Sequence, residues 1–265
     1  MVVNHETRGN IMFDTHIHTL PFSPDAHQTI DEVLAVAKSC PYGMCLTEHI
    51  DYGVSGNLIF EFDPEEYFKK YRSYRSDKLL LGVEMGLIPG ELNHVKETVD
   101  KFPFDMVIGS IHVVDGYDIA LKEYYHTHTK DEAYAKYLDA MIDMIRKYHE
   151  FDTLAHVDYV CRYCDYEDPE LYVSDYKEAL EAVFTFLIEN NKCLELNTRR
   201  LNNKTAIDTL REIMRVYHHL GGRYITVGSD AHYSKNIAVN FKEAEKMINE
   251  FNFIPVYFKE RKRIE

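Results

Sequence analysis

The sequence has no uninterrupted hydrophobic run of the roughly 18–20 residues that a membrane-spanning helix requires. Its beginning, residues 1–11, is polar and lacks the hydrophobic segment of a secretory signal peptide. The five cysteines are an odd number without a repeated close-set pair, which disfavours the disulfide framework of a small secreted protein. We read the one close pair, Cys161 and Cys164, as reduced thiols. We therefore expect a cytoplasmic enzyme whose residues 1–11 form a polar leader without stable structure.

Positive charge is also in short supply. The chain has 30 Lys and Arg residues against 44 Asp and Glu residues, a formal net charge of −14. Proteins that bind nucleic acid need a basic surface to match the phosphate backbone, so a nucleic-acid partner is disfavoured. A small phosphorylated substrate is compatible with this charge, because bound divalent cations can reverse the sign of a local pocket.

What the sequence does have is a regular alternation of short hydrophobic runs and longer amphipathic segments. We predict strands at 11–13, 44–46, 79–83, 106–108, 153–155, 193–196 and 224–227, and helices at 29–38, 64–74, 130–148, 174–188 and 205–218. This order favours parallel pairing in a single barrel-like α/β domain over residues 12–265, followed by a charged surface tail at 259–265. An open doubly wound sheet is the alternative, but it collects its ligands at one switch point.

Histidine and carboxylate side chains recur just after these predicted strands. The positions are Asp14-x-His16-x-His18, Glu48-His49, Glu84, His112, His156-x-Asp158 and Asp230-x-His232. Catalytic residues of α/β barrels lie at the carboxyl ends of the strands, so we expect these side chains to meet. Residues two apart on a strand share a face, which lets each His-x-His or Asp-x-His pair reach one ion. This mixture of imidazoles and carboxylates suits zinc, manganese or iron, and it predicts a polynuclear metal centre.

Other histidines are poorer candidates for ligands. His94, His149, His218 and His219 lie on helix-like segments and are interpreted as surface residues. His126 and His128 lie in a long predicted loop, which we read as a plain loop; the segment 117–128 is also a candidate specificity lid. Of the two nearby residues Asp25 and His27, Asp25 is the better candidate for a metal ligand.

The ordered set of motifs resembles the polymerase-and-histidinol-phosphatase (PHP) superfamily over residues 12 to at least 235. Further segments resemble its monofunctional histidinol-phosphatases. These are Phe22-Ser-Pro-Asp25, Phe104-Asp-Met-Val-Ile-Gly-Ser110, His156-Val-Asp-Tyr-Val-Cys-Arg162-Tyr163 and Leu194-Glu-Leu-Asn197-Thr198-Arg199.

The resemblance implies a distorted, TIM-like (β/α)7 barrel with three divalent metal ions (zinc, manganese or iron) at the carboxyl ends of its strands. The first ion would be held by His16, His18, Glu84 and Asp230; the second by Glu84 as a bridge, with His112 and His156; and the third by Asp25, His49 and His232. Some relatives have His in place of Asp25, which bears on the choice of the third metal. We interpret Glu48, Asp158 and Glu195 as residues that orient imidazoles.

Such a centre would hydrolyse a phosphomonoester. A hydroxide that bridges two cations would attack phosphorus in line, and the third ion with Arg162 and Arg199 would stabilise the oxygens. A guanidinium matches phosphate in bidentate fashion, which favours a phosphate-binding role for both arginines over surface ion pairs. Asp230 or a metal-bound water would protonate the leaving alkoxide. The predicted catalytic residues are Asp230, His232, Arg162 and Arg199.

The predicted substrate is L-histidinol phosphate, a small molecule, with no membrane partner. The alternatives with the same centre are a nucleotide or phosphodiester and a phosphotyrosine substrate. A metal-dependent amidohydrolase also places His-x-His after its first strand, but it usually has a lysine ligand or a single late Asp. A non-catalytic metal-binding protein would not need the full ligand set. The sequence leaves the oligomeric state open.

Overall fold

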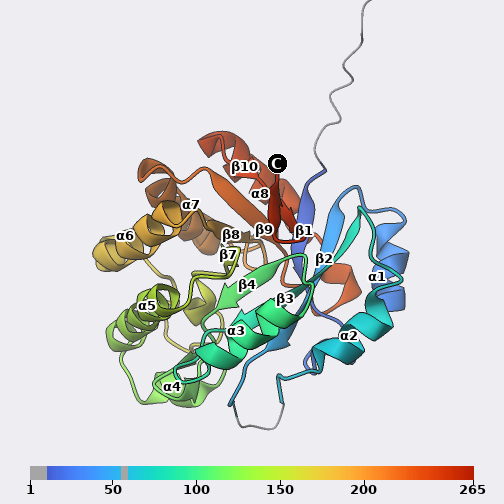
Figure 1. Cartoon of the computed structure of the whole chain (residues 1–265). Coiled ribbons are helices and arrows are strands. Elements are labelled where there is room, and N and C mark those ends of the chain that lie inside the picture. Colours follow the sequence, from blue (N-terminus) through green and yellow to red (C-terminus); the bar gives the residue numbers. More distant parts are fainter. Residues whose placement is uncertain (1–10, 55–58) are drawn as a thin grey trace, which may run out of the picture.

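The computed structural model describes residues 11–54 and 59–265, so nearly all of the predicted leader lies outside the described residues. Its central element is a sheet of eight parallel strands with helices around it (Figure 1). In spatial order the strands are β1 (Phe13–Ile17), β2 (Gly43–Ile50), β3 (Leu79–Gly86), β4 (Val107–Ser110), β7 (Thr153–Leu154), β8 (Cys193–Asn197), β9 (Tyr224–Gly228) and β10 (Ile254–Pro255). No helix of the described residues has the length and hydrophobicity to cross a membrane.

The sheet curls until β1 meets β9. Beyond the end of β9, Ala231 forms a parallel bridge with Ile17; the His18 amide donates to the Ala231 carbonyl at 3.0 Å. At the other end of β9, Tyr224 and Ile225 pair with β10 instead. Seven strands therefore close a ring where the strands end, and an eighth lies beside β9 where they begin. This confirms the predicted TIM-like barrel and locates its distortion between β9 and β1.

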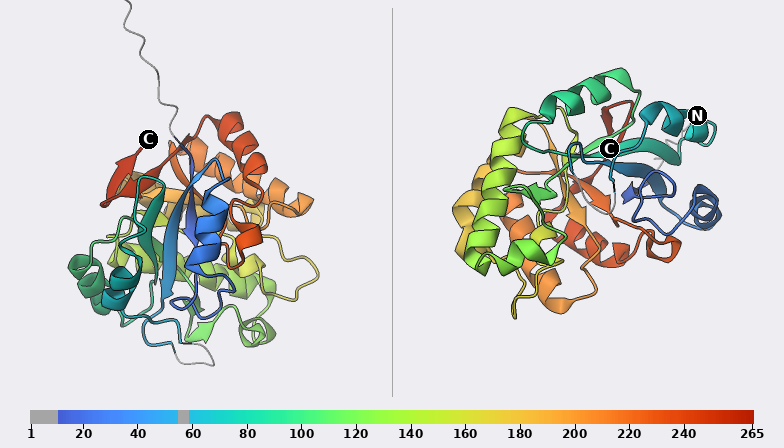
Figure 2. Two further views of the ribbon diagram at one scale, coloured as in Figure 1. Left: turned by 90° about the vertical axis from the view of Figure 1, so that its right-hand side faces the viewer. Right: turned by 90° about the horizontal axis from the view of Figure 1, so that it is seen from below.

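The helices stand outside the strands, as the end-on view in Figure 2 shows. Those that the periodicity predicts are α1 (Ile30–Ala37), α2 (Pro64–Tyr71), α5 (Lys130–Lys147), α6 (Val173–Glu189) and α7 (Lys204–His219). Thr29 and Thr129 begin their helices with capping boxes, and Asp63 caps α2 ahead of Pro64. The patterns do not predict α3 (Leu92–Lys101) and α8 (Phe241–Phe251), which begin without a side-chain cap. A short α4 (Lys122–His126) precedes α5.

The first predicted strand, 11–13, is misplaced, because β1 runs through the polar residues Asp14, Thr15 and His16. These side chains are fully buried, which the hydrophobic pattern of the sequence does not reveal. The other central strands begin within a residue of the predicted positions, and several extend further into the motif residues. His49 and Glu84 thus lie within β2 and β3 rather than after them.

The inside of the barrel is hydrophobic where the strands begin. We call this group the basal cluster; it consists of Phe13, Cys45, Leu80, Met106, Ile108, Ala155, Cys193, Val256 and Phe258. Strand residues of the opposite parity, such as Leu79 and Leu81, pack outward in the larger core beneath the helices. The basal cluster fills one end of the barrel and leaves the other end for polar groups.

The charged ending forms a hairpin rather than the predicted surface tail. β11 (Tyr257–Lys259) pairs with β12 (Lys262–Ile264), and the ring of Tyr257 stacks on Phe13 at 3.9 Å between centroids. Arg261 in its turn donates from Nε to Asp152 at 2.6 Å. The hydrophobic residues Val256, Tyr257 and Phe258 just before the charged ending explain the difference, because they pack on the basal cluster and hold the hairpin there.

Candidate metal centre

The nine side chains predicted as metal ligands gather at the carboxyl ends of the strands. His16, His49 and Glu84 belong to strands, while the others follow strand ends or, for Asp25, lie in the loop before α1. All are buried except Asp25, whose side chain is 32% exposed. The barrel therefore brings together residues spread over more than 200 positions of the chain.

Glu84 lies at the middle of this group. Its Oε2 is 3.2 Å from His16 Nε2 and 2.8 Å from His49 Nδ1, and its Oε1 is 3.0 Å from His156 Nε2 and 3.3 Å from His112 Nε2. The two oxygens thus face different imidazoles, which is the arrangement of a carboxylate that bridges two ions. Burial favours the neutral acid, but the imidazoles of His16, His49 and His112 hold the pKa of Glu84 well below its usual value.

Asp230 completes a second corner of the group. Its Oδ1 lies 3.4 Å from His18 Nε2 and 4.0 Å from His16 Nε2. The backbone of Asp230 is left-handed, with φ of 54°, a conformation that Asp tolerates better than most residues. Although burial opposes ionisation, the charges of Arg162 and His16 lower the pKa of Asp230 well below its usual value, so the carboxylate stays ionised.

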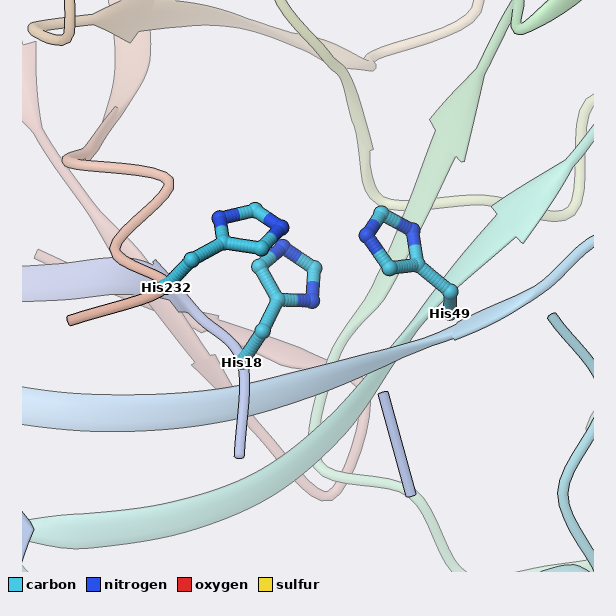
Figure 3. A group of neighbouring side chains, drawn as sticks. All are labelled: His18, His49 and His232. Atoms are coloured by element: carbon cyan, nitrogen blue, oxygen red, sulfur yellow. The ribbon is translucent and has the colours of Figure 1, made fainter. Parts of the chain in front are cut away.

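Three imidazoles form the third corner. Figure 3 shows the rings of His18 and His232 beside each other, with the His49 ring facing them from β2. Ring nitrogens of the three lie within 4.8 Å of one another, and Asp25 Oδ2 is 2.8 Å from His232 Nε2 and 3.7 Å from His49 Nε2. Burial and the neighbouring His49 and His232 rings lower the pKa of His18 well below its usual value. A neutral His18 keeps a lone pair available for a metal ion.

The donor set fits divalent cations. His16 Nε2, His18 Nε2, His49 Nδ1 and Glu84 Oε2 are buried and accept or donate no hydrogen bond among the described residues. Buried polar atoms are nearly always hydrogen-bonded, so such a concentration of exceptions is typical of metal ligands. Four overlapping groups of three ligand atoms are close enough to hold an ion: His18, His49 and His232; His16, His18 and Asp230; His16, Glu84 and His156; and His49, Asp51 and His112.

The residues around these imidazoles agree only partly with prediction. Glu195 accepts from His16 Nδ1 at 2.7 Å, as predicted. Glu48 instead binds Thr19 and Ser23, and it reaches His18 only through the Ser23 hydroxyl, 3.3 Å from His18 Nδ1. The prediction for Asp158 is wrong, because its carboxylate binds Arg200 at 3.0 Å and contacts no imidazole of residues 11–54 or 59–265. That ion pair connects two distant loops, which sequence spacing does not show.

Two residues outside the predicted set contact the centre directly. Both carboxylate oxygens of Asp51 lie 3.1 Å from His112 Nδ1. The Ser110 hydroxyl donates to Glu84 Oε1 at 2.6 Å. Asp51 follows His49 by two residues, so the same-face rule that pairs His16 with His18 could have identified it. A carboxylate on the far nitrogen of an imidazole fixes its tautomer and orientation.

The two predicted arginines lie beside Asp230. Arg162 is buried, donates from Nη1 to Asp230 Oδ2, and has no hydrogen-bond partner for Nε and Nη2 among the described residues. Its guanidinium lies 5.1 Å from the centre of the Tyr159 ring. Arg199 Nη1 is 3.5 Å from Asp230 Oδ1, and its side chain is 39% exposed. Neither is a surface ion pair remote from the centre, the alternative that the sequence left open.

A pocket opens onto the centre from outside. It is lined by Asp25, His49, Asp51, Val54, Phe60, His112, Val113, Asp118, Ala120, His156, Tyr159, Tyr163, Arg199, Asp230 and His232. Asp118 and Ala120 belong to the predicted lid segment, whose closure over a substrate stays a prediction. His126 and His128 bind Asp165 and the Tyr124 carbonyl rather than the centre, but the predicted long loop is wrong at His126, which is the last residue of α4.

The sequence of this chain is similar to those of known proteins. The family model of the PHP domain matches residues 14–199. A probable histidinol-phosphatase of Clostridium acetobutylicum is 41% identical over 253 residues, covering 95% of this chain and 98% of the relative. A histidinol-phosphatase of Lactococcus lactis is 28% identical, covering 91% of each chain.

A solved structure shares the whole fold. The crystal structure of histidinol phosphate phosphatase from Lactococcus lactis, complexed with zinc, L-histidinol and phosphate, superposes with a TM-score of 0.90. The two chains are 27% identical, and the match covers 96% of this chain and 99% of the other.

Proposed function

The chain belongs to the PHP domain family, and from that premise we propose that it is a metal-dependent phosphatase that hydrolyses L-histidinol phosphate to L-histidinol and phosphate. The observation that carries this proposal is the position of Glu84, whose two carboxylate oxygens face separate imidazoles in a buried cluster. The identity of the substrate follows from the relatives, among them the zinc-containing structure with L-histidinol and phosphate.

We further propose three ions in the positions that the family resemblance implies. The first has His16, His18, Glu84 and Asp230 as ligands; the second has Glu84, His112 and His156; the third has Asp25, His49 and His232. The overlapping triads of ligand atoms and the unpaired imidazole nitrogens support this assignment. Zinc is the preferred metal, since a relative contains it, with manganese and iron as alternatives.

Bound divalent ions lower the pKa of coordinated water toward neutrality and polarise phosphoryl oxygens. The chain's own contribution is to position the phosphate. Arg162, with two free nitrogens, and the more exposed Arg199 are proposed to hold the non-bridging phosphate oxygens. Their ion pair with Asp230 keeps that carboxylate ionised, which argues against Asp230 as the proton donor to the leaving alkoxide. We assign Asp230 and His232 to metal binding.

The test is a comparison of kcat/KM among candidate substrates. Purified enzyme would be assayed with L-histidinol phosphate, p-nitrophenyl phosphate, a bis-aryl phosphodiester, a phosphotyrosine peptide and an amide substrate. We expect L-histidinol phosphate to lead by orders of magnitude. A preference for the diester, the phosphopeptide or the amide would refute the proposal. Elemental analysis tests the ion count separately, and full activity with a single bound ion would refute the assignment of three.

A further inference from the structure

The pocket contains one carboxylate whose charge has no partner. Four aspartates line it: Asp25, Asp51, Asp118 and Asp230. Asp25 faces His232 and His49, Asp51 faces His112, and Asp230 faces two arginines and His18. Asp118 forms no ion pair with any lysine, arginine or histidine of the described residues. Among the described residues, the one hydrogen bond to its carboxylate comes from the backbone amide of Ala120 to Oδ1, at 2.8 Å.

Asp118 is held in the wall of the pocket by the hairpin that carries it. It belongs to β6 (Tyr117–Asp118), where it pairs with Val113 of β5 (Val113–Val114). The next residue, Ile119, donates its amide to the carbonyl of His112 at 2.9 Å. The hairpin thus ties the backbone beside Asp118 to a predicted metal ligand, and the Asp118 carboxylate lines the pocket that opens onto the centre.

The electrostatic state of Asp118 differs from that of its neighbours. Burial raises the pKa of Asp118 above its usual value, and the Ala120 amide, His112 and His49 oppose this rise without reversing it. The pKa values of Asp25 and Asp230 are lowered despite burial, by His232 and by Arg162 respectively. A partly buried carboxylate that forms no ion pair is unfavourable to the folded protein, and a cationic ligand in contact with it would reduce that cost.

L-Histidinol phosphate supplies such a cation. The carbon next to its phosphate-bearing carbon carries a primary ammonium group, so this charge must lie close to the bound phosphate. We propose that the Asp118 carboxylate binds the ammonium group of the substrate and selects for it. This inference rests on the proposed function and adds a specificity-determining residue outside the predicted metal and phosphate ligands.

The competing explanation is that Asp118 only stabilises its turn through the bond from Ala120. Asp118→Asn separates the two, because asparagine keeps an oxygen for the Ala120 amide and loses the charge. Two substrates are needed: L-histidinol phosphate and the phosphate ester of 3-(imidazol-4-yl)propan-1-ol, which lacks the amine. A carboxylate–ammonium hydrogen bond corresponds to about 10- to 100-fold in kcat/KM, which we expect Asp118→Asn to lose with the first substrate only.

The control is Asp115→Asn in the same hairpin. Asp115 is exposed, pairs with Lys136, and does not line the pocket. We expect it to leave both substrates unaffected. As an independent readout, titration calorimetry should show weaker binding of L-histidinol to Asp118→Asn and unchanged binding of inorganic phosphate, with metal content equal to that of the wild type.

Each other outcome is informative. Equal losses with both substrates, or reduced metal content, would assign Asp118 a structural role and overturn the inference. An unchanged kcat/KM with both substrates would also overturn it. If the wild-type enzyme hydrolyses both esters equally well, ammonium recognition is absent and the inference is wrong. If it hydrolyses neither but cleaves another phosphate ester, the proposed function itself fails.

Discussion

The two ends of the barrel interior are built from the same strands with opposite chemistry. Successive inward residues of β3 are Leu80, Gly82 and Glu84, which pass from the basal cluster to the middle of the candidate metal centre. At Gly82 a Cβ atom would come within 2.7 Å of the Met106 carbonyl, so the layer between the two ends is tightly packed. The comparison suggests that the first half of each strand supplies stability and the second half supplies function.

The largest effect that would test this division is at the polar end. Replacing Glu84 by Gln removes the charge that lies between the imidazoles. The loss of ion-derived stabilisation of the transition state, several kcal/mol, should lower kcat/KM by roughly 1000-fold or more. Metal content should fall as well, while thermal unfolding of the metal-free protein changes little. Near-normal turnover in this variant would contradict the central role of Glu84.

The matching change at the basal end is Leu80→Ala. Leu80 is fully buried in the basal cluster, and removal of a buried leucine side chain usually costs about 2–5 kcal/mol of unfolding free energy. We expect that loss in denaturant unfolding, with kcat/KM per folded molecule and metal content nearly unchanged. Should activity fall as far as in the Glu84 variant, the two ends would not be separable.

A smaller effect, on metal affinity, is expected from Asp51, which contacts the predicted ligand His112. Asp51→Asn leaves the shape of the side chain but weakens its hold on His112 Nδ1. Loss of such a partner typically lowers metal affinity about 10- to 100-fold. Competition with a chelator would measure the affinity, and excess metal should restore most activity. The neighbouring Tyr52, whose hydroxyl binds Thr98, provides a control as Tyr52→Phe; an equal loss of affinity there would argue against a specific role for Asp51.

The smallest effect concerns the ion pair that attaches the C-terminal hairpin to the basal end. Burial raises the pKa of Asp152 and Arg261 opposes that rise, so Arg261→Met should raise the folded-state pKa further. The ion pair stabilises the fold only while Asp152 is ionised. We therefore expect a deficit of about 1–2 kcal/mol at pH 8 that disappears in acid, where the carboxyl is protonated in both proteins. Lys262→Met, on the exposed side of the hairpin, is the control.

A deficit for Arg261→Met that is the same at pH 8 and in acid would mean that packing of the long side chain, not its charge, stabilises the hairpin. Unfolding monitored by circular dichroism at several pH values distinguishes the two. Activity should be unaffected in either case, because the hairpin lies at the basal end of the barrel.

Many residues of the centre could be predicted from the sequence because their spacing along the chain is short and regular. His16 with His18, and Asp230 with His232, follow the two-residue period of an extended chain, and the hydrophobic run before Glu84 marks its strand. The same local reasoning misplaced β1, because Asp14 and His16 are polar yet buried, and it missed β10, which is only two residues long. It also assigned Asp158 to an imidazole when its partner is Arg200.

The sequence by itself determined which residues could bind metal, the order in which strands present them, and the family resemblance, because these properties are written in spacing and residue type. The tertiary structure decided the partners. Glu195 reaches His16 across 179 residues, and Asp118 is the pocket aspartate that forms no ion pair within the described part of the chain. The contact between Glu195 and His16 depends on a distance that exists only after the barrel closes, since that step brings the ends of non-consecutive strands together.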